Sequence, residues 1–502
     1  MIDYSRVIKG FVSNLFTKLI IALYAVISVP ILVANLDIEG YGVVVFITQI
    51  TPFIFLLEFG LVNALGRTMA RYRGMGDYES LNSIFVSTFW FLVLISLITS
   101  ILLIVFNYSK NEIIFTDWLN LEILKEFDYL FLILFLMIIT IPLRSFRGIL
   151  ESEYKFYVID KINILVRVIA IIALVSLSIL DRLNLNLAIL ITVGMVILPE
   201  ILCFLVYRRE KKLNILNLTY LKKDSILEQL DVGAAGFLTT LGAIIVRQGF
   251  VVLFSLKAGI DSIHIMSIPL MIVLIISPIV GRVSAIYLPI FSELSGNNKN
   301  AESEEQLRKS FFILSTLSII AIAIFSFAGN EIIYLWLGNS FPSSDVTKIF
   351  IITFLFLTFT LIARSFLMFR SYLKAYGHHR YVAFVSICSA VWVILAAAYS
   401  EVFIANTSLS MWQYFSLIFI SRLVIFDIIV TLIVTFFKCD IKLNEIIVLW
   451  LKKIFVFGVA AIALGMLLNC VLSGILLKVI QTLIVISIIY FYFLTLKKDS
   501  YI

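Results

Sequence analysis

The sequence predicts an all-α integral membrane protein with about fourteen transmembrane helices, arranged as two six-helix lobes and a C-terminal helix pair. Of its 502 residues, 62% are hydrophobic and only 14% are charged. The mean hydropathy of +1.08 lies far above that of soluble domains, in which about half of the residues are apolar. Apolar stretches of about 20 residues, the length that crosses a hydrocarbon layer, recur from Phe11 to Leu496.

The helices are predicted where these apolar stretches lie between charged flanks. Six are expected at residues 11–36, 42–65, 83–106, 128–147, 158–180 and 186–207. Eight more are expected at 232–256, 264–290, 310–329, 346–369, 380–400, 411–437, 447–472 and 474–496. We therefore expect an N-terminal lobe at 1–207, a basic cytoplasmic linker at 208–231, a second lobe at 232–437 and an additional pair of helices at 438–502.

The loop charges predict that both ends of the chain are cytoplasmic. Alternate loops carry twenty-five Lys and Arg residues, and the loops on the other side carry six. Because basic residues gather in cytoplasmic loops, the rich loops are assigned to the inner side. The six outer residues are Lys110, Lys125, Arg182, Lys257, Lys348 and Lys478.

The loops exclude several functions. None holds a GxxxxGK[ST] phosphate loop, so we expect a transporter without its own ATPase and no enzyme. The longest outer loop, 107–127, has about 21 residues and leaves no room for an outer domain. The cysteines have no metal-binding spacing, and the basic residues form no nucleic-acid-binding domain, so we expect no metal, no cofactor and no nucleic-acid partner.

Basic side chains inside the predicted helices point to an anionic substrate. Placing a charge at the bilayer centre costs about 2.5–3.5 kcal/mol, so such residues face a protein interior or a wet cavity. Guanidinium groups there suit phosphate or pyrophosphate, because their planar donors match phosphate oxygens. The candidate substrate-binding residues are Arg247, Arg282, Arg422, Lys18, Arg364 and Arg167.

Alternative roles are open for most of these residues. Lys18, Arg167 and Arg364 could reach the cytoplasmic interface instead, and Arg422 could pair with Asp427 or Glu58. Arg247 and Arg282 have no acid nearby in the sequence and are the strongest candidates. Glu58 and Asp427 are candidates for proton or sodium coupling, or for ion pairing with a buried arginine.

Three prolines fall in one predicted helix, 264–290. They are Pro269, Pro278 and Pro289. Because proline removes a backbone hydrogen bond and kinks a helix, we expect irregular backbone there, of the kind that lines cavities in transporters.

Short motifs resemble bacterial O-antigen and polysaccharide flippases of the Wzx type, which belong to the multidrug/oligosaccharidyl-lipid/polysaccharide (MOP) exporter superfamily. They are Ser13-Asn14, Pro30, Tyr41-Gly42, Glu58-Phe59-Gly60-Leu61 with Arg67 to Arg71, Leu288-Pro289 with Ser292-Glu293-Leu294, Leu335-Trp336-Leu337-Gly338, and Tyr372 to Gly377 with Arg380. The chain departs from the pattern at Glu58, where Asp is frequent, and in its last two helices, which exceed the minimal twelve.

The resemblance implies a MATE-like fold of two lobes around a central cavity, working by alternating access in a bacterial cell inner membrane. The implied substrate is an oligosaccharide on undecaprenyl pyrophosphate, contacted by intramembrane arginines and moved to the outer leaflet. Membrane lipids and polysaccharide polymerase or ligase machinery are the implied partners. Two other functions stay open, a small-molecule exporter of the same superfamily and a membrane polysaccharide polymerase or ligase.

Overall fold

The computed structural model describes residues 4–108, 128–153, 155–210, 217–296, 299–439 and 446–448, and these residues form helices and no strands. Eleven of their helical stretches are long and apolar enough to cross a membrane. The first stretch, Phe16–Glu58, holds two of the predicted helices, so the eleven stretches account for the twelve predicted before residue 438. The predicted helices at 447–472 and 474–496 lie outside the described residues, apart from 447 and 448.

The chain folds into two compact units. Unit 1 comprises Met1–Ile244 and Gly259–Asp261, and unit 2 comprises Ile245–Ala258 and Ser262–Ile502. The division falls within the helical stretch that follows the basic linker. The sequence-based boundaries at 207, 231 and 437 stay predictions.

Unit 1 begins with α1 (Tyr4–Ile54), a long helix that bends at Asp37, where φ is 61°. Further along the chain come η1 (Phe55–Glu58), α2 (Leu61–Met75), α3 (Tyr78–Tyr108), α6 (Asp128–Ile139), η3 (Ile141–Leu143), α7 (Arg144–Ser152), α8 (Phe156–Ile179), α9 (Leu185–Glu210), η4 (Leu218–Tyr220) and α10 (Lys223–Ile244). Its core is aromatic, with the Phe146 ring 5.7 Å from Phe85 and 4.9 Å from Phe204. Close packing of this kind holds helices together in lipid.

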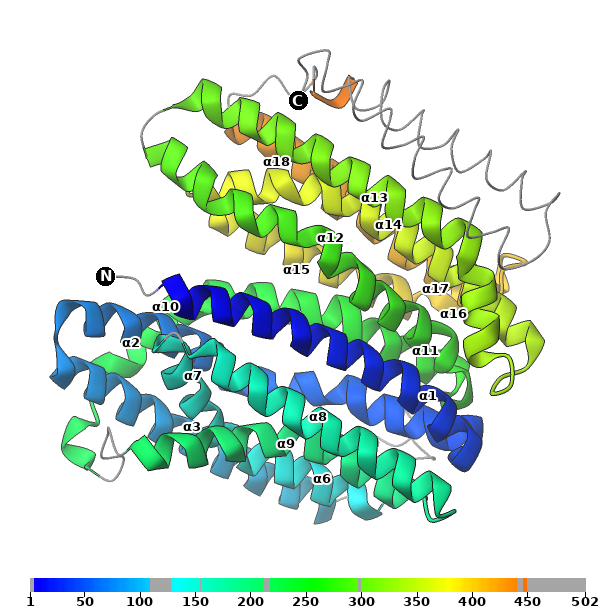
Figure 1. The fold of residues 1–502 in the computed structure, drawn as a ribbon, viewed down its shortest axis with the longest axis horizontal. Helices are drawn as coiled ribbons and strands as arrows, with labels where there is room; N and C mark the ends of the chain where they lie inside the picture. Colours follow the sequence, from blue (N-terminus) through cyan, green and yellow to red (C-terminus); the bar gives the residue numbers. More distant parts are fainter. Residues whose placement is uncertain are drawn as a thin grey trace. The chain divides into compact units, whose positions relative to one another are not determined.

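Unit 2 contains η5 (Ile245–Gly249), α11 (Phe250–Ala258), α12 (His264–Gly296), α13 (Asn300–Leu337), α14 (Ser343–Ala375), α15 (His379–Ala398), α16 (Ser400–Ala405), α17 (Met411–Arg422), η7 (Leu423–Val430) and α18 (Thr431–Lys438). A short turn, η6 (Ile260–Ser262), precedes α12. Helices α12, α13 and α14 pack against one another (Figure 1). The Phe311 ring of α13 lies 5.2 Å from both Phe366 and Phe369 of α14.

The three prolines of α12 do not produce the irregular backbone that the sequence predicted there, and irregular turns occur in other elements. Helix α12 runs as one α-helix through its three prolines. Within the described residues, the π-helical turns are η5 and η7, whose wider i→i+5 turns accommodate an extra residue and often mark functional sites.

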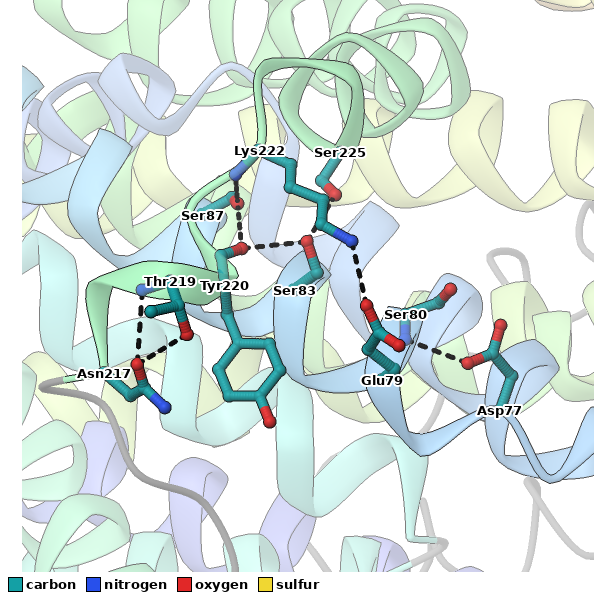
Figure 2. A network of polar contacts seen from close by, with 10 residues as sticks. All are labelled: Asp77, Glu79, Ser80, Ser83, Ser87, Asn217, Thr219, Tyr220, Lys222 and Ser225. Carbon is teal, nitrogen blue, oxygen red and sulfur yellow. Dashed lines mark hydrogen bonds and ion pairs between the residues drawn. The ribbon is translucent and has the colours of Figure 1, made fainter.

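The end of the basic linker is held against α3 within unit 1 (Figure 2). The carbonyl of Tyr220 accepts hydrogen bonds from the hydroxyls of Ser83 (2.8 Å) and Ser87 (3.2 Å), and the Ser87 hydroxyl accepts one from the backbone N–H of Lys222 (2.8 Å). The ammonium of Lys222 also lies 3.2 Å from the Glu79 carboxylate. Residues 217–222 of the linker therefore pack against α3 within unit 1.

Candidate substrate-binding site

The partly buried carboxylate of Asp427 lies among the charged side chains of unit 2. It lies in the π-helical turn η7 and accepts hydrogen bonds from two arginines, one on each oxygen. Arg370 of α14 donates to Oδ1 at 2.7 Å, and Arg422, the last residue of α17, donates to Oδ2. All three side chains are between 11% and 15% exposed, so water screens the pairs weakly.

The π-helical turn also supplies a backbone acceptor to this cluster. The Phe426 carbonyl accepts hydrogen bonds from Arg370 Nη2 and from Thr431 Oγ1, each at 3.0 Å. The Thr431 hydroxyl oxygen in turn accepts one from Arg370 Nε at 3.0 Å. Arg370 is therefore held by three partners on η7 and α18, which fixes its guanidinium and leaves it little freedom to bind a ligand.

Two further arginines belong to the same charge cluster but have no carboxylate of their own. Arg247 lies in the π-helical turn η5 and interacts electrostatically with Arg422 and Asp427. Arg364 of α14 interacts with the same charges and with Arg247 and Arg370. Within the part of the chain that the structure describes, no carboxylate forms an ion pair with Arg247 or Arg364.

The surroundings of Arg364 are polar but neutral. Its Nη2 lies 3.3 Å from the Ser277 hydroxyl of α12, a long hydrogen bond, and its guanidinium passes beside Gly281. A Cβ at Gly281 would lie 3.5 Å from Arg364 Nη1, so the absence of a side chain there leaves room beside the cation. The unit 2 cluster thus consists of Arg247, Arg364, Arg370 and Arg422 around Asp427, and positive charge exceeds negative charge.

Unit 1 holds a second, partly buried cluster with the opposite balance, in which Glu58 and Glu200 are the buried members. Arg144 Nη1 lies 3.3 Å from Glu58, and its Nε lies 3.8 Å from Glu200. Arg147 lies 3.2 Å from Glu151 and 3.9 Å from Glu200. Three carboxylates therefore face two arginines, and each of these arginines is matched by acid.

A break between the helices η1 and α2 places Glu58 in that cluster. After η1 the backbone turns left-handed at Phe59 (φ 50°) and Gly60 (φ 74°) before α2 begins. Gly60 packs so tightly that a Cβ would lie 3.1 Å from the carbonyl oxygen of Gly233 in α10. The Arg144 guanidinium stacks 3.9 Å above the Phe55 ring, which lies one turn before Glu58.

The structure brings together only some of the candidates. Arg247, Arg364 and Arg422 share the unit 2 cluster with Asp427, and the pairing of Arg422 with Asp427 follows one of the alternatives left open by the sequence. Lys18 is an exposed side chain of α1, and Arg167 of α8 interacts electrostatically with Tyr24 of α1, so both belong to unit 1. Arg282 lies in α12, and its side chain is outside the described part.

Arg370 is a site residue that the sequence pattern assigned to a cytoplasmic loop. The predicted helix ends at 369, where the charge begins, whereas α14 continues to Ala375. The signal that could have found it is the spacing of Phe366, Phe369 and Leu373, whose buried positions continue the apolar face of the helix beyond Arg370.

Helices of this number and length, with charges buried among them, define a multi-pass membrane protein. A family model described as "Polysaccharide biosynthesis protein" matches residues 7–295, more than half of the chain. The chain belongs to this family. No curated protein matches it by sequence.

Solved structures show a shared fold. The lipid II flippase MurJ in an inward closed conformation has a TM-score of 0.69 and 16% identity, covering 97% of this chain and 98% of its own. An inward-facing multidrug resistance MATE family transporter of the MOP superfamily has a TM-score of 0.61 and 13% identity, covering 84% and 96%. A MOP superfamily transporter from Pyrococcus furiosus has a TM-score of 0.51 and 12% identity, covering 86% and 94%. The chain therefore shares the fold of these transporters, as the resemblance implied.

Proposed function

We propose that this protein is a flippase for an oligosaccharide carried on undecaprenyl pyrophosphate, the repeat unit of O-antigen or a related polysaccharide. It moves this lipid from the cytoplasmic to the outer leaflet of a bacterial inner membrane by alternating access. The observation that carries the proposal is the unit 2 cluster, in which two arginines pair with the single carboxylate of Asp427 and two more arginines interact with the same charges. Membership of a polysaccharide biosynthesis family and the fold shared with a lipid II flippase support it.

The paired and the unpaired arginines have different proposed roles. Arg370 and Arg422 are held by Asp427 and form a fixed cationic base. Arg247 and Arg364 have no carboxylate and can offer planar donors to a pyrophosphate, whose oxygens match the guanidinium geometry. Arg247 is exposed and Arg364 is half-buried, so a ligand can reach both guanidinium groups, and their uncompensated positive charge favours an anionic one.

The remaining parts of the substrate need different surroundings. The polyprenyl chain is apolar and would stay among the membrane lipids, while the glycan travels with the pyrophosphate. Polymerase or ligase machinery on the outer side would consume the product, which pulls transport forward by mass action.

The test is the leaflet distribution of radiolabelled lipid-linked repeat units in cells that lack this protein, read with a membrane-impermeant glycan probe on intact spheroplasts. We expect the units to accumulate in the cytoplasmic leaflet and to reach the outer leaflet when the gene is restored. Accumulation of unpolymerised units in the outer leaflet would instead identify a polymerase or ligase.

A small-molecule exporter would give a third result. Lipid-linked units would then distribute normally in the deleted cells, and the cells would accumulate a drug or metabolite. A site for cationic drugs needs excess carboxylate, whereas the unit 2 cluster has excess arginine.

A further inference from the structure

Helix α9 of unit 1 has a buried face and an exposed face. Glu200, Cys203 and Tyr207 follow one another at intervals of three and four residues, and all three are buried. Leu198 and Leu205 are 43% and 45% exposed. Because successive residues of an α-helix are about 100° apart, these leucines point away from the buried set. Since leucine is favoured in hydrocarbon, we assign the exposed face of α9 to lipid.

A pocket lies along the last two turns of α9, on the side of the exposed leucines. It has a volume of about 480 Å³, and the described residues that line it are Leu202, Leu205, Val206, Arg208 and Arg209. Leu202 and Val206 are half-buried and also pack against the apolar cluster beside α8. Leu205 and the two arginines are exposed. The pocket is therefore apolar along the helix and basic where the helix ends.

The two arginines of the pocket differ from Arg144 and Arg147 in their partners. Arg144 and Arg147 both reach Glu200 on the buried face of α9. Among the described residues, no carboxylate forms an ion pair with Arg208 or Arg209. Their guanidinium donors can therefore bind an anion, and phosphate oxygens match the planar geometry of these donors.

The place of the pocket along the helix limits the kind of anion. The membrane-spanning stretch Leu185–Arg209 ends at the two arginines, and the loop charges predict that this end is cytoplasmic. Arginines in such a position reach the headgroup region while their carbon chains lie along apolar surface. A ligand that fits the pocket therefore has a negative charge at headgroup depth and an apolar part beside the leucines.

We propose that this pocket binds one anionic phospholipid of the cytoplasmic leaflet. Its phosphate accepts hydrogen bonds from Arg208 and Arg209. The first methylene groups of its acyl chains lie against Leu202, Leu205 and Val206. Basic pockets beside transmembrane helices on the cytoplasmic side suit such headgroups, because charge and apolar chain are recognised together. The assignment does not depend on the proposed function.

Two other anions share part of this chemistry. Inorganic phosphate would use the arginines but not the apolar lining. A polyprenyl-pyrophosphate glycan would use both, but the proposed function assigns its pyrophosphate to the unpaired arginines of unit 2. Bulk phospholipid surrounds α9 at all times, and it is the occupant that the exposed leucines and the two arginines fit together.

The experiment counts lipids on the full-length purified protein in detergent by native mass spectrometry. Phosphatidylglycerol is the anionic probe, and phosphatidylcholine is the probe without net charge. We expect the wild type to bind one phosphatidylglycerol per chain more tightly than phosphatidylcholine. Arg208→Gln with Arg209→Gln should weaken that binding at least about tenfold, because two cationic contacts are lost.

Lys222→Gln with Lys223→Gln is the matched control. It removes the same charge from two exposed basic residues of unit 1 that do not line the pocket. We expect this control to bind phosphatidylglycerol like the wild type. An equal loss in the control and in the arginine variant would reduce the effect to general surface charge and overturn the site.

Leu205→Trp tests the pocket with both arginines in place. The larger side chain fills the space beside Arg208 and Arg209, and binding should weaken about tenfold because one or two methylene groups of the lipid lose their apolar contact. Since all three residues are exposed, we expect these variants to keep the unfolding temperature of the wild type. Unchanged phosphatidylglycerol binding in both the arginine variant and Leu205→Trp overturns the site.

Competition identifies the source of the phosphate. We expect inorganic phosphate not to displace phosphatidylglycerol, and a polyprenyl-pyrophosphate glycan to bind this pocket no more tightly than phosphatidylglycerol does. Displacement by inorganic phosphate would make the pocket a site for free anions, and tighter binding of the glycan lipid would make it a substrate site. Either result overturns the phospholipid assignment, and neither contradicts the proposed function.

Discussion

The two units carry charged clusters of similar size but opposite balance. In unit 1 the acids outnumber the arginines, and Arg144 and Arg147 each reach two carboxylates within 4 Å. In unit 2 the arginines outnumber the acids. Asp427 forms ion pairs with two of them, whereas Arg247 and Arg364 form no ion pair with a carboxylate among the described residues. The unit 1 cluster is matched by its own carboxylates, whereas the unit 2 cluster carries excess positive charge.

This difference shows that charged side chains can have two roles in one fold, one in stability and one in function. In a matched ion pair, the attraction between the partners offsets the cost of removing both charges from water. Such a pair also holds together the helices that carry it. An unmatched cation in a membrane protein is costly and persists where it serves function. The two clusters should therefore respond differently to substitution, in stability for unit 1 and in substrate binding for the unpaired arginines of unit 2.

The largest effect on stability is expected at the shared acid of unit 2. Asp427→Ala leaves Arg370 and Arg422 buried without their carboxylate, which should destabilise the fold by about 3–5 kcal/mol. The measurement is thermal unfolding of the purified protein in detergent. An unchanged unfolding temperature would show that the two arginines are solvated and would contradict the buried cluster.

A smaller effect is expected in unit 1, where the cluster keeps other acids. Glu58→Gln removes one charge partner of Arg144 but leaves Glu200, so a loss of about 1–3 kcal/mol is expected. Glycan transport per folded molecule should stay close to that of the wild type. A selective loss of transport with full stability would mean that Glu58 acts in transport, and the contrast between the units would fail.

The backbone that positions Glu58 offers a related test. Gly60→Ala places a Cβ 3.1 Å from the Gly233 carbonyl at a φ of 74°, which should cost about 1–2 kcal/mol. Gly74→Ala is the matched control, because Gly74 lies in the adjoining helix α2 and a Cβ added there would have no atom within 4 Å. That control should stabilise α2 slightly, because alanine is the better helix former. Equal unfolding temperatures for the two variants would contradict steric strain at residue 60.

The smallest effects are expected at exposed carboxylates outside both clusters. Hydrogen bonds from Ser80 lower the pKa of Asp77, and the Lys257 ammonium lowers the pKa of Glu401. A lowered pKa in the folded state stabilises the protein above the ordinary pKa, and this stabilisation is lost as the pH falls through the folded value. Asp77→Asn and Glu401→Gln should therefore change the unfolding temperature little at pH 7 and flatten its decline below about pH 4. A large change at pH 7 would contradict this.

The sequence predicted the helices well because each crossing needs a long apolar stretch, whichever neighbour it packs against. It predicted the charged partners less well. Arg144 and Arg147, at the end of the helix predicted at 128–147, were counted with the cytoplasmic segments, and so was Arg370, because the helix predicted at 346–369 ends before that charge. In the structure they lie in α7 and α14, where carboxylates from other helices offset their charge.

The ends of the helices were also predicted less well than their positions. The helix predicted at 310–329 extends from Asn300 to Leu337, since its amphipathic first turns carry i,i+4 ion pairs such as Glu305 with Lys309. The hydrogen bonds of Asp160 to Ser13 and Thr17 were not predicted, because a single acid near a predicted helix start is typical of a charged flank. The two hydroxyls lie more than 140 residues earlier in the chain, and only the fold brings them together with Asp160.

The central claim, that Arg247 and Arg364 hold the pyrophosphate of the substrate, is tested most directly by binding. Affinity for a polyprenyl-pyrophosphate glycan is measured on purified wild type, on Arg247→Gln with Arg364→Gln, and on Arg71→Gln, whose arginine pairs with Glu228 in unit 1. We expect the double variant to bind at least about 100-fold more weakly with an unchanged unfolding temperature, because each charged hydrogen bond is worth about 1.5–3 kcal/mol. Arg71→Gln should bind like the wild type. Undiminished affinity in the double variant would contradict the account.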